Sequence, residues 1–148
     1  NEAFADFDNA IQFDDKMSNA FNGRGSIYFS RGQYQQAIHD FNMVVTLDPG
    51  HKFAYSNLGS CYRQLGQNDL ALQSFNSAIA NNPSNGVAWL SRSYVYQQLG
   101  QRQNALQDAL KAKELGANVD DSYIQGLQQG KMPPQGRHDN RANPSNKP

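Results

Sequence analysis

The chain has 148 residues with 13 basic and 13 acidic side chains, and it carries no net charge at neutral pH. This length leaves room for one domain, and no stretch is apolar for as long as a membrane span requires. A single cysteine excludes an intrachain disulfide, and the lack of a Lys/Arg stripe argues against nucleic-acid binding. The many Asn and Gln residues and few Lys residues fit a soluble protein of a bacterial cytoplasm or periplasm equally well, so the compartment stays open.

The first expected element is a helix over residues 2–14, inside a segment 1–17. Phe4, Phe7 and Ile11 recur at helical spacing and predict one apolar face. Several aspartates surround this face, and no preceding helix is present to cover it. An exposed apolar patch is typical of an interaction site, so this end is a candidate for contact with another chain.

From residue 18 onward the chain repeats itself every 34 residues, and segments 18–51, 52–85 and 86–119 align without a gap. Most aligned columns keep one kind of side chain. The recurring columns are Phe21, Tyr55 and Trp89; Gly25, Gly59 and Ser93; Tyr28, Tyr62 and Tyr96; Gly32, Gly66 and Gly100; Ala37, Ala71 and Ala105; and Phe41, Phe75 and Ala109.

Each unit predicts two helices. The first, helix A, is expected over 19–31, 53–65 and 87–99, and the second, helix B, over 35–47, 69–81 and 103–115. A glycine follows each helix A, where it can adopt the left-handed conformation that ends a helix. Pro49 and Pro83 end helix B in the first two units. The small column is expected to face Ala37, Ala71 and Ala105 where two backbones cross, and the large aromatics, Trp89 and Tyr62 among them, are expected to be largely buried.

This pattern of aromatic, small, Tyr, Gly, Ala and Pro columns at a 34-residue period resembles the tetratricopeptide repeat (TPR) family. The resemblance implies an all-α fold, a right-handed superhelical stack of antiparallel helix pairs. Segment 1–17 then matches helix B of a truncated preceding repeat. Residues 120–130 are expected to form a closing helix, with Tyr123 in the Trp89 column. Residues 131–148 form a Pro/Asn-rich basic tail of net charge +3, which we interpret as a linker or as a peptide that occupies a groove.

No catalytic or metal site is predicted, and no cofactor. The three histidines are dispersed without partners at ligand spacing. Asp120 is better explained as the N-cap of the closing helix than as part of an acid–base pair. Cys61 lies between Ile27 and Val95 in its column, which indicates a buried and inert thiol.

The resemblance places the informative surface on the helix A residues that do not face the core, because these line a concave face in such stacks. They are mostly amides and hydroxyls, which can pair with a peptide backbone, together with a few aromatic residues. The predicted peptide-binding residues are Asn19, Asn22, Ser26, Phe53, Ser56, Asn57, Ser60, Arg63, Gln64, Leu90, Ser91 and Tyr94.

Chaperone-binding members of the family grip an acidic C-terminus with a carboxylate clamp of Lys, Asn and Arg residues at five positions. Those positions hold Asn22, Ser26, Asn57, Val87 and Ser91 in this sequence. Asn57 matches and every cation is absent, which argues against a chaperone adaptor because a desolvated carboxylate needs charged partners.

The sequence therefore predicts a non-catalytic interaction module, a scaffold or adaptor that binds an extended peptide or a partner helix in a mostly neutral-polar groove. Two alternatives stay open. The chain is a self-assembly module that stacks through its N-terminal end and tail, or it is a regulatory fragment of a larger enzyme.

Overall fold

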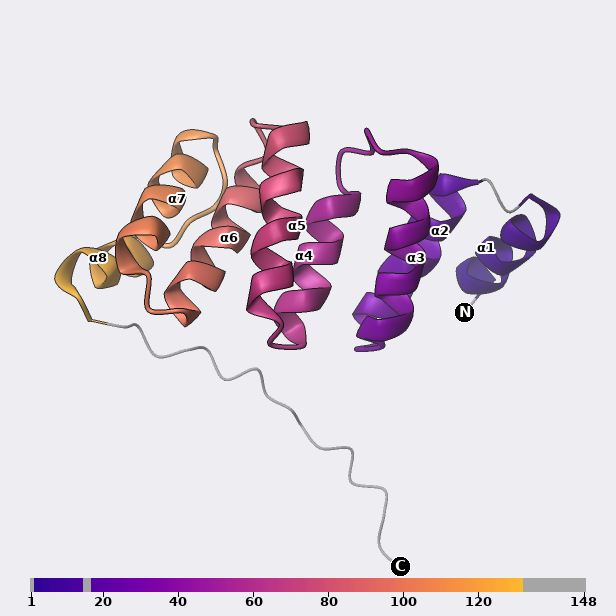
Figure 1. The fold of residues 1–148 in the computed structure, drawn as a ribbon, viewed down its shortest axis with the longest axis horizontal. Helices are drawn as coiled ribbons and strands as arrows, with labels where there is room; N and C mark the ends of the chain where they lie inside the picture. The colour runs from indigo at the N-terminus through magenta and orange to yellow at the C-terminus, as the bar shows by residue number, and fades with distance from the viewer. Residues whose placement is uncertain (1, 15–16, 132–148) are drawn as a thin grey trace, which may run out of the picture.

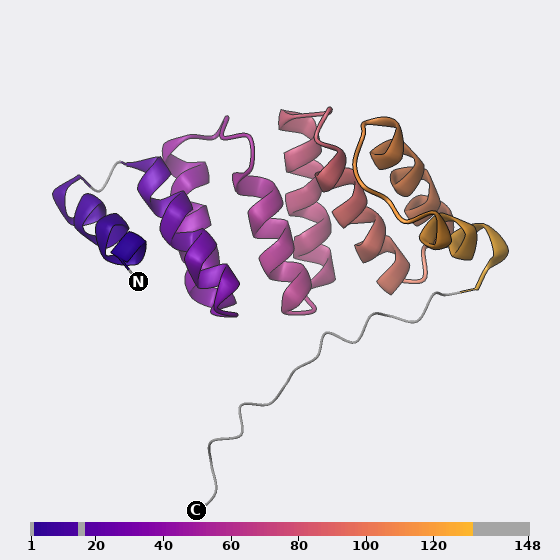
Figure 2. The same ribbon diagram turned by 180° about the vertical axis from the view of Figure 1, so that it is seen from behind.

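A computed structural model describes residues 2–14 and 17–131, and this part of the chain is helical and contains no strand. The helices form a row from α1 at one end to α8 at the other (Figures 1 and 2). The all-α prediction is confirmed, whereas the tail beyond residue 131 lies outside the described residues. The helices are α1 Glu2–Phe13, α2 Ser18–Ser30, α3 Tyr34–Leu47, α4 Ala54–Gln64, α5 Asn68–Asn81, α6 Gly86–Gln98, α7 Arg102–Glu114 and α8 Asp121–Gln129.

The contacts between helices define a curved stack. The hairpins α2–α3, α4–α5 and α6–α7 pack most extensively, and each hairpin also contacts the next through α3–α4 and α5–α6. In addition α2 contacts α4 and α4 contacts α6, whereas α3, α5 and α7 do not contact one another in the described chain. The row of α2, α4 and α6 is therefore the tighter one, so these three helices form the concave face.

The same turn closes the first helix of every hairpin. Gly32, Gly66 and Gly100 have φ angles of 72°, 71° and 72°. In each turn the amide that follows the glycine donates to the carbonyl of the Tyr28, Tyr62 or Tyr96 column, at 2.9, 2.9 and 2.8 Å. This is the Schellman arrangement, which satisfies the last carbonyls of a helix and favours glycine at the left-handed position.

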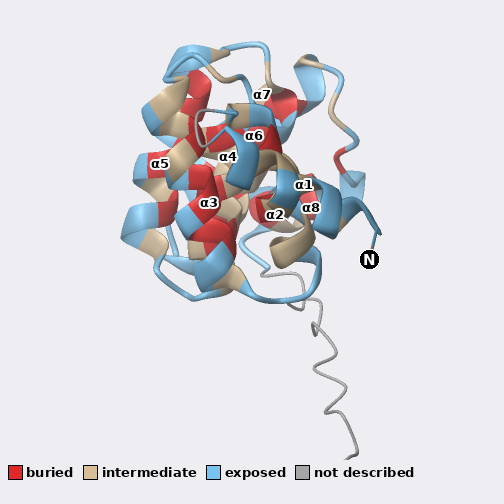
Figure 3. Cartoon of the chain, turned by 90° about the vertical axis from the view of Figure 1, so that its right-hand side faces the viewer, coloured by how far each residue is buried: buried red, intermediate tan, exposed pale blue. Residues whose placement is uncertain are grey.

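A phenyl ring against a glycine sets the spacing within the first two hairpins. A Cβ atom at Gly59 would lie 2.8 Å from the Phe75 ring, and one at Gly25 would lie 3.0 Å from Phe41. Both rings are buried. Figure 3 shows that α3 and α5 each carry both buried and exposed residues. Gly25 and Gly59 thus lie closest to the phenylalanine column, whereas the sequence suggested that they would face the alanine column.

In the third hairpin other residues fill the space between the two helices. Ala109 replaces the phenyl ring and Ser93 replaces the glycine. The Ser93 hydroxyl lies 2.6 Å from the Ala105 carbonyl and 2.8 Å from the Tyr123 hydroxyl. Tyr123 of α8 is buried in one cluster with Ala105 and Ala109, so the closing helix fills the space that a phenylalanine occupies elsewhere.

Two hairpins contain a buried ion pair between their helices. Arg24 donates to both carboxylate oxygens of Asp40, at 2.8 Å each, and Arg92 donates to both oxygens of Asp108 at 2.7 and 2.9 Å. Both aspartates are buried. Bidentate geometry of this kind is the strongest form of the Arg–carboxylate contact.

Each of these arginines has a third partner on the preceding helix. Arg24 donates to Asp8 of α1 at 2.6 Å, and Arg92 donates to Asn76 of α5 at 2.6 Å. Asp8 and Asn76 occupy the same column of the repeat. Helix α1 thus supplies to α2 the same kind of contact that α5 supplies to α6.

The expectation that α1 presents an uncovered apolar face is wrong. The Phe4 ring lies 5.2 Å from the Tyr28 ring, the Phe7 ring lies against Gly23, and Ile11 packs against the cluster that contains Phe21. These residues are half-buried because α2 itself covers them. The exposed apolar side chain at this end is Phe13, which is 93% exposed.

The expectation for Trp89 and Tyr62 also needs correction. Both are partly buried, whereas Phe41 and Phe75 are fully buried. The Trp89 indole remains near the surface because its Nε1 donates to the Pro83 carbonyl at 2.9 Å. The phenylalanine column is therefore the centre of the core.

We predict that Gly59→Ala destabilises the protein although alanine favours a helix by about 1 kcal/mol over glycine. The added methyl group meets the buried Phe75 ring, and overpacking of this kind costs roughly 1–3 kcal/mol. Urea unfolding followed by circular dichroism measures the change. Gln73→Ala on the exposed side of α5 is the control, expected within about 0.5 kcal/mol of wild type. An unchanged or higher midpoint for Gly59→Ala would contradict the packing described.

A second prediction uses the middle hairpin as a template, since it holds Leu58 and Ser74 where its neighbours hold arginine and aspartate. Arg92→Leu alone leaves Asp108 buried and unpaired, which costs about 3–5 kcal/mol. The double change Arg92→Leu with Asp108→Ser copies the middle hairpin and should recover most of that loss. Urea midpoints of the two variants give the comparison, and a double variant as unstable as the single one would refute the template argument.

Candidate functional site

The predicted peptide-binding residues lie on the three helices of the concave face or at their first turn. Asn19, Ser26 and Phe53 are exposed, and the remaining nine are half-buried. The structure gathers some of them closely and separates others, so the face divides into regions of different chemistry.

The most closely gathered set lies between α2 and α4. Ser26, Asn57 and Ser60 line a small cleft of about 120 Å³ together with Phe29 and Phe41. Across this junction the Asn57 amide donates to the Asn22 side-chain oxygen at 3.3 Å. The two asparagines thus join neighbouring repeats, and each keeps further hydrogen-bonding capacity.

Three serine hydroxyls of the face, those of Ser26, Ser56 and Ser60, already donate their protons. Ser26 donates to the Asn22 carbonyl at 2.8 Å, Ser56 to Phe53 at 2.8 Å, and Ser60 to Ser56 at 2.9 Å. A hydroxyl that donates to its own helix can still accept. These three serines therefore offer acceptors to a ligand, and the amides and Arg63 are among the side chains that can donate.

Leu90 and Tyr94 of α6 lie apart from the cleft. Both pack against the cluster that contains Tyr123 and Leu127 of α8, and the rings of Tyr94 and Tyr123 are 4.8 Å apart. The closing helix therefore takes part of the surface that the third repeat would otherwise present.

Arg63 of α4 is the one cation among the twelve predicted peptide-binding residues. Its guanidinium carbon lies 5.9 Å from the centre of the Tyr94 ring. Its Nε atom is buried and has no hydrogen-bond partner in the described part of the chain. Burial lowers the pKa of Arg63, and the phenol groups of Tyr94 and Tyr34 act in the opposite direction.

Arg92 of α6 is not available to a ligand as a second cation. Asp108 and Asn76 occupy its guanidinium, and its hydrogen bonds to Asp108 raise the pKa of Arg92 above its usual value. A signal for this arrangement was present in the sequence, because Arg24 and Arg92 share one column, and Asp40 and Asp108 share another sixteen residues later.

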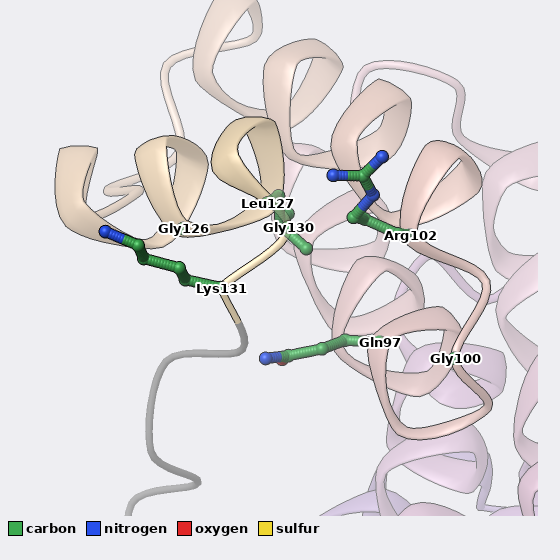
Figure 4. A pocket seen from close by; sticks show the side chains of 7 residues that line it. All are labelled: Gln97, Gly100, Arg102, Gly126, Leu127, Gly130 and Lys131. Carbon is green, nitrogen blue, oxygen red and sulfur yellow. The ribbon is translucent and has the colours of Figure 1, made fainter.

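A second cleft, of about 290 Å³, lies between the α6–α7 turn and the end of α8 (Figure 4). Sequence reasoning did not identify it. Its two cations, Arg102 and Lys131, extend in different directions in Figure 4, so they do not converge on one point. The lining residues are Gln97, Gly100, Arg102, Gly126, Leu127, Gly130 and Lys131.

Among the described residues, no group of three or more His, Cys, Asp or Glu side chains is placed to hold a metal ion. Asp120 accepts from the Ser122 amide at 2.9 Å and caps α8, as predicted. Cys61 is buried, also as predicted, and burial raises the pKa of its thiol to about 12. In the described chain no helix combines the length and apolar character that crossing a membrane requires.

Comparison with known proteins identifies the repeats. Models of the tetratricopeptide repeat match residues 18–51, 53–85 and 87–117, which together make up more than half of the chain. The chain belongs to the tetratricopeptide repeat family. TPR domains are typically non-enzymatic modules that mediate protein–protein interactions. No curated protein sequence matches the chain significantly.

Several solved TPR structures share this fold. The first TPR of Spaghetti (RPAP3), bound to the HSP90 peptide SRMEEVD, is 24% identical with a TM-score of 0.73, covering 76% of this chain and 91% of that one. MamA is 22% identical with a TM-score of 0.79, covering 86% of this chain and 76% of that one. The Arabidopsis OM64 TPR domain is 18% identical with a TM-score of 0.73, covering 76% and 95%. At these identities the likeness establishes the fold.

We predict that Cys61 does not react with Ellman's reagent in the native protein at pH 9. The buried thiol has a pKa of about 12, so the reactive thiolate is scarce at pH 9. A cysteine of the unfolded chain has a pKa of about 8.5 and is mostly thiolate at that pH. Absorbance at 412 nm should rise when urea unfolds the protein. Rapid labelling of the native chain would contradict the burial of this residue.

Proposed function

We propose that this TPR domain is a non-catalytic scaffold that binds an extended segment of a partner protein along α2 and α4 of its concave face. The observation that carries the proposal is the cleft at the α2–α4 junction, where Asn57 and Asn22 meet beside Ser26, Ser60 and Phe29. The amides supply donors and acceptors, the serines supply acceptors, and the phenyl ring supplies an apolar floor. An extended backbone, with its alternating N–H and C=O groups, complements such a surface.

Exposed apolar side chains at the start of α4 and α6 support the same proposal. Phe53 is 55% exposed and Val87 is 65% exposed, and they occupy one column at the start of α4 and α6. An apolar side chain of the bound segment can pack against this pair, and burial of apolar surface contributes about 25 cal/mol per Å². The proposed ligand is therefore a peptide with an apolar side chain and a backbone that pairs with the asparagines.

The proposed mode differs from the capture of an acidic C-terminus by a cationic clamp. The RPAP3 domain is bound to the peptide SRMEEVD, but the five clamp positions of this chain hold Asn22, Ser26, Asn57, Val87 and Ser91 and contain no cation. We therefore propose recognition of an internal, extended segment. The self-assembly alternative loses its main support, because α2 covers the apolar residues of α1.

The test is the double variant Asn22→Ala with Asn57→Ala. Removal of two hydrogen-bonding amides should weaken partner binding at least about fivefold, since each lost hydrogen bond contributes roughly 0.5–1.5 kcal/mol. Both side chains are half-buried at the surface and join only each other, so the melting temperature should change little. Binding partners are first captured with the wild-type chain, and affinities are then measured by calorimetry.

The matched control is Gln73→Ala with Gln107→Ala, which removes two exposed amides from α5 and α7 instead. This control should bind as wild type does. Equal loss in both double variants, or loss in the control alone, would place the binding surface outside the α2–α4 junction.

A further inference from the structure

We propose that Arg63 is the anion-binding point of the concave face and that it pairs with one carboxylate, an Asp or Glu side chain of the bound segment. This inference rests on the proposed function, and it adds a specific chemical requirement to the ligand. The requirement is one acidic side chain within an otherwise neutral peptide.

The position of Arg63 supports this assignment. It lies one turn beyond Ser60 on α4, so it continues the surface of the cleft at the α2–α4 junction. Tyr94 of α6 lies beside the guanidinium, and the charge of Arg63 also interacts with Tyr34 of α3. The side chain of the second repeat is thus influenced by one tyrosine of the first repeat and one of the third.

Comparison with the other two embedded arginines shows what Arg63 lacks. Arg24 has carboxylate partners in Asp8 and Asp40, and Arg92 has Asp108 and an asparagine. No hydrogen bond or ion pair engages Arg63 among the described residues, and its Nε atom is buried. The Nε atom is the buried unpaired atom, and the terminal amino groups are not among the buried unpaired atoms of the described chain, so we assign the contact with the carboxylate to them.

The free energy of this arrangement favours an anionic ligand. Arginine stays protonated in proteins, so Arg63 carries its charge into a partly desolvated site, and desolvation lowers its pKa. A carboxylate would compensate that cost with charge-assisted hydrogen bonds to the terminal amino groups. A neutral acceptor compensates less, because hydrogen bonds between an ion and a neutral group are weaker than those between two ions.

The exposed cations Arg102 and Lys131 fit this role less well than Arg63. Arg102 and Lys131 border the cleft beside α8, on the far side of the third repeat, and their charged ends diverge (Figure 4). Arg102 is exposed and therefore well solvated. It offers a control with the same charge outside the proposed binding surface.

The first test needs no ligand. Arg63→Met keeps an unbranched side chain of similar length and removes an uncompensated charge, so the melting temperature should stay equal or rise. Arg92→Leu, which breaks a satisfied pair, should lower it clearly. A fall for Arg63→Met as large as that for Arg92→Leu would show that Arg63 has a structural role, and it would overturn the assignment.

The second test identifies the ligand chemistry. The full chain is used to select from a phage-displayed library of random twelve-residue peptides, and enriched peptides are synthesised for calorimetry. We expect each tight binder to contain an Asp or Glu whose replacement by Asn or Gln weakens binding at least about tenfold. Arg63→Gln should weaken the acidic peptide by a similar factor, and Arg102→Gln should not.

The double-mutant cycle decides whether the two groups touch. If they do, the amide peptide should bind wild type and Arg63→Gln with nearly equal affinity, because the pair is already broken. Additive losses, or enriched peptides without any acidic requirement, would overturn the role of Arg63 and leave the proposed peptide-binding function intact. Failure of the wild-type chain to enrich any peptide would instead overturn the proposed function and this inference with it.

Discussion

Close contact between a phenyl ring and a glycine determines the geometry of this stack. Where Phe41 and Phe75 lie against Gly25 and Gly59, the two helices of a hairpin approach as closely as a missing side chain allows. In the third hairpin Ser93 and Ala109 take these positions, and Tyr123 of α8 packs beside them. Along the stack α2 contacts α4 and α4 contacts α6, whereas α3, α5 and α7 do not contact one another in the described chain, so the concave face lies on the first row of helices.

The buried charged side chains also follow the repeat, with the middle hairpin as the exception. Arg24 and Arg92 each find an aspartate within their own hairpin. The middle hairpin has neither member of this pair and carries its partly buried arginine at position 63 instead, where no carboxylate of the described residues pairs with it. In a stack each unit contacts only its neighbours, so one repeat can lack the Arg–Asp pair while the others keep it.

Much of the fold was predictable from the sequence because the period, the glycine stops and the apolar spacing are local signals. The left-handed turns at Gly32, Gly66 and Gly100 are an example. The wrong expectations concern contacts between segments. The sequence did not reveal that α2 covers the apolar face of α1 or that Trp89 is partly exposed. For the candidate site, residue types were predictable, but hydroxyls already committed to backbone carbonyls became visible only in three dimensions.

The ends of the stack explain why the first two repeats are the better binding surface. At the C-terminal end Tyr123 of α8 packs against Tyr94 and hydrogen-bonds to Ser93, so the closing helix stabilises the third repeat by covering it. At the N-terminal end α1 covers the outer side of α2 but leaves the junction of α2 with α4 open. A solenoid needs covered ends to stay soluble. Here the closing helix covers part of the concave face of the third repeat. In the described chain the Asn22–Asn57 pair and Arg63, whose Nε atom has no hydrogen-bond partner, lie on the part of the face that remains open.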